Sequence, residues 1–142
     1  ASVLISGVLS DNGASRVILN LGIEKLIDII LTEEAVREAR LGIKKKYPKS
    51  KIKLESLYVI LSELKASIHR TPKSQSIKKF EGLISDPNDR HVLAAADQYK
   101  ADFLVTLDRK HFFTPILKEA HLNFEINLPG EFFKKYRSSN NS

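Results

Sequence analysis

Apolar residues recur at helical spacing in two segments of the chain. The clearer one spans residues 55–70 and places its apolar positions at i, i+3, i+4 and i+7: Leu57, Ile60, Leu61, Leu64 and Ile68. The second covers residues 14–25 and follows a turn cluster at residues 10–13. Both segments are therefore predicted to be amphipathic helices.

Short, continuously apolar runs predict buried strands. Residues 27–31 and 103–107 form two such runs, and the second ends directly before Asp108. A further strand is expected near residues 124–127. Residues 76–85 are ambiguous, and a short strand is one alternative there.

Capping residues predict where other helices begin. Thr32 and the two glutamates after it predict a helix over residues 33–46. Asp86 followed by Pro87 predicts a helix that runs to Tyr99. Two further helices are expected near residues 115–120 and 130–137. Helices that alternate with short apolar strands indicate an α/β domain with a mainly parallel sheet.

Length and composition limit the classes of protein. A chain of 142 residues fits one domain, which we expect over residues 1–137, followed by a disordered polar tail over residues 138–142. No apolar run reaches the ~18 residues of a membrane span, and residues 1–9 lack the pattern of a signal peptide. Without cysteine, a metal must use oxygen or imidazole ligands. The absence of cysteine is also typical of a cytoplasmic protein.

Basic residues exceed acidic ones, with a formal net charge of +6. Such an excess favours a polyanionic partner, because lysine and arginine release counterions from phosphates. Six of the lysines lie in residues 44–53. A solvated lysine-rich surface is the alternative interpretation.

Three acids are candidates for chemistry. Asp108 directly follows a buried strand, where ligand sites form in parallel sheets, although it could equally cap the next helix. Asp89 borders the apolar face of its helix and needs a partner or a metal there, whereas Asp86 is the expected cap. Glu38 has no cation at helical spacing, but an ordinary surface glutamate is the alternative. If the three acids converge, they form an oxygen-rich site for Mg²⁺ or Mn²⁺, and in a basic protein phosphodiester hydrolysis is its natural use.

Four segments resemble successive landmarks of a PIN domain. They are VLISG at residues 3–7, LTEEAVRE at 31–38, DPNDRHVLAAA at 86–96 and ADFLVTLD at 101–108. The last two are the most specific, since their order, their spacing and the Thr-x-Asp ending all agree. The resemblance covers residue 1 to about residue 129.

The resemblance implies a three-layer α/β/α sandwich with a mainly parallel central sheet. It also implies a metal-dependent endoribonuclease similar to VapC-type toxins, with Mg²⁺ or Mn²⁺ as cofactor. By position, Glu38, Asp89 and Asp108 match the family's acids and are expected to be catalytic and to hold the metal. Asp86 is expected to be an auxiliary acid and Thr106 an auxiliary hydroxyl.

The start of the chain departs from the family pattern. The family's first acid ends strand one in a D-x-N-V-L-I-S pattern, and here that acid falls immediately before Ala1, so we expect the first strand and acid to lie upstream. Ser2, a third auxiliary residue, stands where the family often has asparagine. An aspartate before Ala1 would favour the nuclease. An apolar or basic residue there would favour an inactive PIN-like module that binds RNA or a protein. A receiver-like phosphotransfer domain is a weaker alternative, because the acids lie in the wrong elements for it.

RNA is the expected partner, and no membrane is expected. Its backbone would be positioned by the basic residues Lys44, Lys45, Lys46, Lys49, Lys51, Arg70 and Lys73. An antitoxin partner follows only if the chain is a toxin. A homodimer is also open, because the apolar residues near 57–68 and 112–113 could form its interface or belong to the core.

Overall fold

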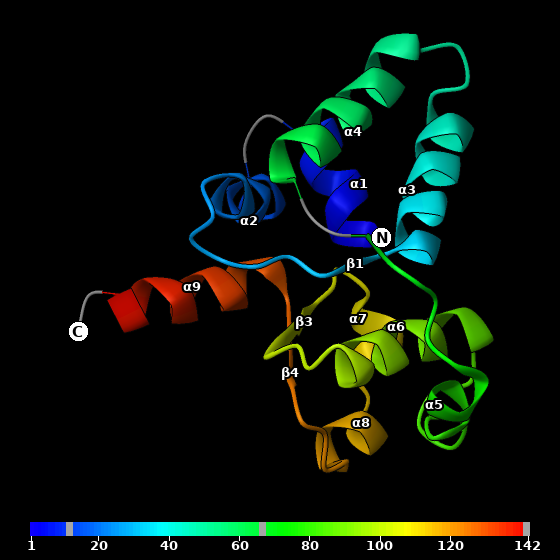
Figure 1. The fold of residues 1–142 in the computed structure, drawn as a ribbon. Coiled ribbons are helices and arrows are strands. Elements are labelled where there is room, and N and C mark those ends of the chain that lie inside the picture. The colour runs from blue at the N-terminus through cyan, green and yellow to red at the C-terminus, as the bar shows by residue number, and fades with distance from the viewer. Residues whose placement is uncertain (11–12, 66–67, 141–142) are drawn as a thin grey trace.

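The computed structural model of the protein describes residues 1–10, 13–65 and 68–140. Most of this chain is helical, and the helices surround short strands (Figure 1). In chain order the elements are α1 (Ser2–Leu9), α2 (Ala14–Ile23), β1 (Leu31–Thr32), α3 (Glu33–Lys46), α4 (Lys51–Leu64), β2 (Ile68–His69), α5 (Ser74–Lys78), α6 (Pro87–Gln98), β3 (Phe103–Val105), α7 (Arg109–Phe112), α8 (Pro115–Glu119), β4 (Glu125–Asn127) and α9 (Pro129–Asn140).

The strands pair in parallel. β1 pairs with β2, with Leu31 opposite Ile68, and β3 pairs with β4, with Leu104 opposite Ile126. Helices α3 and α4 connect the first pair, and α7 and α8 connect the second. Parallel strands need such crossover connections, so the α/β class expected from the sequence is confirmed.

The central sheet is divided into two parts. We expected one mainly parallel sheet, but the strands of the described residues form two separate two-stranded sheets. Within the described residues, β1 and β3 each bond to a single partner strand and not to each other. The predicted strand at residues 27–31 also contributes only Leu31, because residues 27–30 do not join the ladder.

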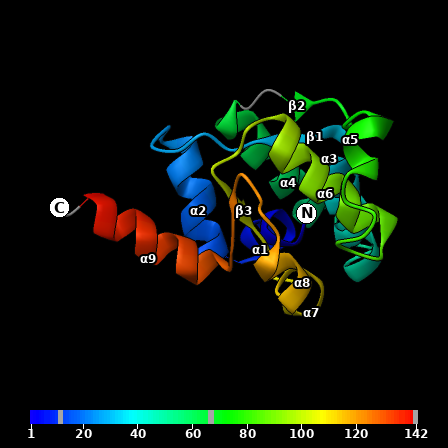
Figure 2. The ribbon, with the colours of Figure 1, turned by 90° about the horizontal axis from the view of Figure 1, so that it is seen from below.

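Each pair of strands packs into its own hydrophobic cluster. The first cluster gathers side chains of α1–α4 and β1 around the fully buried Ile43 and Leu57. The second gathers side chains of the segment from α5 to β4 around the fully buried Leu93. Figure 1 shows the helices of the first cluster above those of the second. Seen from below in Figure 2, α9 lies against α2 and so connects the end of the chain to the first part.

Local capping explains the helices that begin where the sequence predicts. Thr32 Oγ1 accepts a hydrogen bond from the amide of Ala35 (3.1 Å), so α3 has its expected bounds. Asp86 Oδ1 accepts from the amide of Asn88 (2.9 Å), and Pro87 is the first residue of α6. The assignment of Asp86 as a helix cap is therefore confirmed.

Helix α4 differs from its expected bounds of 55–70. It begins earlier because Ser50 Oγ accepts a hydrogen bond from the amide of Lys53 (3.4 Å) and caps it. It ends earlier because Lys65 adopts a left-handed conformation, with φ of 48°. Ile68 consequently lies in β2. Residues 66–67 lie outside the described residues.

Two other segments also differ from expectation. The ambiguous segment 76–85 contains the end of the helix α5 and no strand. Helix α9 runs to Asn140, so the first residues of the expected polar tail are helical, and residues 141–142 lie outside the described part. The turn expected at residues 10–13 includes residues 11–12, which also lie outside it.

The apolar residues considered for a homodimer belong mostly to the core. Leu57, Ile60, Leu64 and Phe112 are buried, whereas Ile68 is 45% exposed. A homodimer stays a prediction, and most of these side chains are not available to form it.

Helices α3 and α4 have 14 residues each. In the part of the chain that the structure describes, no helix is both long enough and apolar enough to cross a membrane.

Leu57→Ala should lower the free energy of unfolding by about 3 kcal/mol, because truncating a fully buried leucine costs roughly 2–5 kcal/mol through weaker packing and the cavity left behind. Chemical denaturation measures the change. Val59→Ala on the same helix is the control, since Val59 is 54% exposed. Equal losses of stability in the two variants would contradict the placement of Leu57 in the core.

Candidate metal centre

Asp108 lies just beyond the carboxyl end of β3. Its backbone amide donates a hydrogen bond to Thr106 Oγ1 (3.1 Å), and its carboxylate caps α7 by accepting from the amide of His111 at Oδ1 (3.0 Å). The capping role considered from the sequence is therefore present. It does not exclude a functional role, because a carboxylate has further lone pairs to offer.

His111 also binds the second oxygen of Asp108. Its Nδ1 lies 2.8 Å from Asp108 Oδ2. Since an ionised carboxylate can only accept, Nδ1 carries the proton of this hydrogen bond. Burial acts to raise the pKa of Asp108, but the hydrogen bonds and charge of His111 outweigh it. The pKa of Asp108 therefore lies below its ordinary value, so this acid stays ionised.

Asp89 lies in the first turn of α6, where it is half-buried. Burial raises its pKa above the ordinary value, and the negative charges of Asp86 and Asp108 raise it further, while His111 acts in the opposite direction. The negative charge of Glu38 raises it as well. Asp89 is therefore an acid whose charged neighbours are mostly negative.

The side chains of Asp89, Asp108 and His111 form one cluster. One potential ligand atom from each lies within 4.8 Å of the others. The structure thus brings together two of the three acids singled out in the sequence, although they belong to different elements. It adds His111, which the sequence reasoning missed.

A local signal could have identified His111. When an aspartate caps a helix, the residue three positions later donates its amide to the carboxylate, and its side chain starts beside the same group. A histidine at that position can add a bond from its ring. The segment Asp108–His111 has this spacing.

Glu38 borders the cluster without joining it. It is half-buried in the second turn of α3, and the three-residue cluster does not include it. Its negative charge nevertheless acts on Asp89. Glu38 is therefore close enough to Asp89 to influence it electrostatically.

Ser2 connects the start of α1 to the loop that carries Asp108. Its Oγ accepts a hydrogen bond from the amide of Leu107 (3.2 Å) and lies 3.5 Å from Thr106 Oγ1. Thr106 in turn accepts from the Asp108 amide. The hydroxyls of Ser2 and Thr106 thus bond to backbone amides of this loop and not to the carboxylates. Nearby, the buried Asn127 has no hydrogen-bond partner for its Oδ1 within the described residues.

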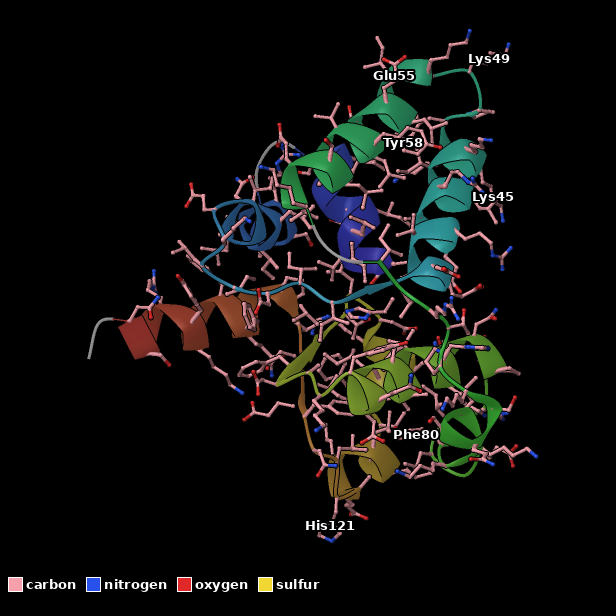
Figure 3. The ribbon with its side chains drawn as sticks, viewed as in Figure 1. Lys45, Lys49, Glu55, Tyr58, Phe80 and His121 are labelled. Atoms are coloured by element: carbon pink, nitrogen blue, oxygen red, sulfur yellow. The ribbon has the colours of Figure 1, made fainter. Side chains whose placement is uncertain are left out.

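The basic candidates lie in two other places. The five lysines at residues 44–51 are exposed at the end of α3, in the loop after it and at the start of α4, and Figure 3 shows Lys45 and Lys49 among them. Arg70 and Lys73 are exposed between β2 and α5. The Arg70 carbonyl accepts from the Tyr99 hydroxyl (2.6 Å), which fixes the backbone and leaves the guanidinium outside this bond.

The donor set suits a hard divalent cation. Carboxylate oxygens are the ligands that Mg²⁺ and Mn²⁺ prefer, and Asp89 and Asp108 supply them. A cation between them would offset the repulsion that raises the pKa of Asp89. Hydrogen bonds from neighbouring groups commonly orient metal-binding carboxylates, and His111 provides one to Asp108. The residues present therefore fit the ion.

His111→Ala should weaken Mn²⁺ binding about 10- to 100-fold, the usual effect of losing a group that orients a metal ligand. The reason is that Asp108 loses the hydrogen bond from Nδ1. Isothermal titration calorimetry measures the affinity. His121→Ala is the matched control, because His121 is exposed in the loop between α8 and β4 (Figure 3). Unchanged affinity in His111→Ala would remove His111 from the centre.

Comparison with known families gives one match. A family model described as PIN domain matches residues 1–110, which include Glu38, Asp89 and Asp108 and end just before His111. PIN domains are in general nucleases, and they typically use divalent metal ions. No curated protein and no solved structure shows significant similarity.

Proposed function

Because this chain belongs to the PIN-domain family, as its motifs predict, we propose that it is a metal-dependent endoribonuclease. Its centre would consist of Asp89 and Asp108, with His111 and Glu38 beside them. The single observation that supports this proposal best is the approach of Asp89, Asp108 and His111 to within 4.8 Å of one another. The toxin role and the antitoxin partner remain predictions from the resemblance.

Each residue of the centre would have a different role. A bound Mg²⁺ or Mn²⁺ supplies Lewis acidity and lowers the pKa of water to generate a nucleophile. Asp89 and Asp108 would hold the ion. His111 would keep Asp108 ionised and fix its orientation through Nδ1. Its Nε2 would accept a proton when the ring is neutral.

Glu38 would extend the negative field of the centre from the side of α3. Its charge already acts on Asp89, so the same charge would attract the cation. Ser2 and Thr106 would act through the backbone, by fixing the loop that ends at Asp108. Each of these residues therefore has a role that does not require direct contact with RNA.

RNA would be held by basic side chains outside the acidic centre. Exposed lysines and arginines contact phosphates without reading the bases, and Arg70 and Lys73 lie in the segment that leads from β2 into α5. A substrate bound by its backbone would be cleaved with little preference for sequence, unless other contacts add one.

The test is cleavage of labelled single-stranded RNA by the purified protein with Mg²⁺, with Mn²⁺ and with chelator. The proposal expects cleavage with metal and none with chelator. Cleavage that persists in chelator would contradict a metal-dependent mechanism. Absence of cleavage of both a synthetic substrate and total cellular RNA, in a folded protein that binds RNA, would instead favour the inactive PIN-like module.

A further inference from the structure

An open basic cavity lies in the loop between α3 and α4, outside the cluster of Asp89, Asp108 and His111. It has a volume of about 700 Å³, and its lining includes Lys46, Lys49 and Lys51 together with Tyr47 and Ile52. We call this cavity and its lining the hairpin tip. The three lysines are exposed, so their ammonium groups are accessible to a ligand.

The ring of Tyr47 gathers positive charge at the hairpin tip. The Nζ of Lys53 lies 4.4 Å from the centre of this ring, and the Nζ of Lys46 lies 5.8 Å from it. Cations are attracted to the face of an aromatic ring, and this attraction offsets part of the repulsion between the two lysines. Tyr47 therefore attracts two ammonium groups to a single ring.

These lysines have no acidic partner in the structure. Within residues 1–10, 13–65 and 68–140, none of the six lysines of residues 44–53 forms an ion pair with a carboxylate. Those in the last turn of α3 suit the negative end of its dipole. Lys51 and Lys53 lie in the first turn of α4, which contains no acid, and a cation there is unfavourable for the helix. The stability of α4 therefore does not explain Lys51 and Lys53.

Helix α3 sets the distance between the hairpin tip and the acidic centre. Glu38 and Lys46 belong to the same helix, and eight residues of helix correspond to a rise of about 12 Å. Figure 3 shows Lys45 on α3 and Lys49 in the loop that follows it. A ligand that reaches both places must therefore be extended and carry negative charge along its length.

We propose that the hairpin tip is a second binding site for the phosphate backbone of single-stranded RNA, and that it makes binding depend on the length of the RNA. The inference rests on the proposed function for its choice of polyanion. Single-stranded nucleic acids bind along basic grooves with site sizes of about 4–16 nucleotides. A longer RNA can occupy the acidic centre and the hairpin tip at once, whereas an RNA of only a few nucleotides has fewer phosphates to place at the second site.

The test measures binding without cleavage, in chelator, by fluorescence anisotropy. Fluorescein-labelled single-stranded RNAs of about 3 and about 12 nucleotides, below and within the usual site sizes, are titrated with the protein at several salt concentrations. The wild-type protein should bind the longer RNA at least about tenfold more tightly. Lys49→Gln with Lys51→Gln should remove most of this advantage. It should also lower the slope of log Kd against log salt by about 0.7 for each phosphate that the variant no longer neutralises.

The matched control replaces two lysines elsewhere. Lys118→Gln with Lys134→Gln makes the same change in net charge, and both residues are exposed on other helices. This variant should bind both RNAs as the wild type does. Tyr47→Leu should weaken binding of the longer RNA too, because it releases the lysines from their shared ring.

The outcomes separate the two proposals. If the protein cleaves RNA but the hairpin-tip variant binds the longer RNA as tightly as the control does, the second site is refuted and the nuclease stands. If the length dependence is present and lost in the hairpin-tip variant, but no RNA is cleaved, the second site stands and the nuclease is refuted. Failure of the wild type to bind either RNA would refute the second site as well.

Discussion

Asp108→Asn should abolish metal-dependent RNA cleavage while leaving the protein folded. The asparagine keeps a side-chain oxygen that can cap α7 through the His111 amide, and asparagine caps helices about as well as aspartate. It loses the negative charge that would hold the cation. We expect kcat/KM to fall by more than the roughly 10- to 100-fold that loss of an orienting neighbour costs. The free energy of unfolding should change by only about 1 kcal/mol, since the pair with His111 is partly exposed.

Two measurements check this prediction, namely cleavage kinetics and urea denaturation. Asp102→Asn is the matched control, because Asp102 is an exposed acid that precedes β3 at its opposite end. The control should cleave RNA at the wild-type rate. Wild-type cleavage by Asp108→Asn would refute the assignment of the centre, whereas loss of cleavage together with unfolding would show only a structural role.

Asp89→Asn should stabilise the metal-free protein at neutral pH and remove most of its response to metal. The folded state raises the pKa of Asp89, so it binds this proton more tightly than the unfolded state does. Stability attributable to Asp89 therefore falls as pH rises from the ordinary value of about 3.9 through the raised pKa. Asparagine carries no charge and avoids that loss, so its advantage should be greatest above this range and disappear below it.

Mn²⁺ should act differently on the two proteins. A ligand at 100 times its Kd stabilises the folded state by about 2.7 kcal/mol, which in a domain of this size raises the melting temperature by roughly 10 °C. The wild type should show this rise, and Asp89→Asn should show little of it because it has lost a ligand. Thermal denaturation with and without Mn²⁺, at pH 4 and pH 7, measures both effects. A metal-free Asp89→Asn protein less stable than wild type at pH 7, or a full metal response in it, would contradict an Asp89 whose charged neighbours are mostly negative.

The elements that were predicted best from the sequence are those determined by nearby residues. Thr32 and Asp86 each cap their helix through an amide two or three residues away, so the bounds of α3 and the start of α6 could be predicted from local sequence. Helix α4 was misplaced because Ser50, outside its apolar pattern, caps it. The division of the sheet could not be predicted, since it depends on which strands pair over long distances in the chain.

The candidate site, too, could be predicted only as far as it depends on nearby residues. Asp89 and Asp108 were chosen from a motif, but their approach depends on how α6 packs beside β3, which no spacing in the sequence reveals. His111 was missed because its ring reaches Asp108 only after the chain turns into α7. Glu38 was grouped with the other acids by resemblance, and the structure places it at the border of the cluster.

The acids near the centre come from two separately packed parts of the molecule, which we call the first and the second unit after their hydrophobic clusters. Glu38 and Ser2 belong to helices of the first cluster, whereas Asp89 and Asp108 belong to the part packed around the second. Native proteins open locally in cooperative units, and hydrogen exchange detects such openings. Opening of either unit would break the bond from the Leu107 amide to Ser2 and separate the acids, even while the other unit stays folded. A cation held by Asp89 and Asp108 would also attract Glu38 from the first unit, so exchange in helices as distant as α4 and α8 should slow together when it binds.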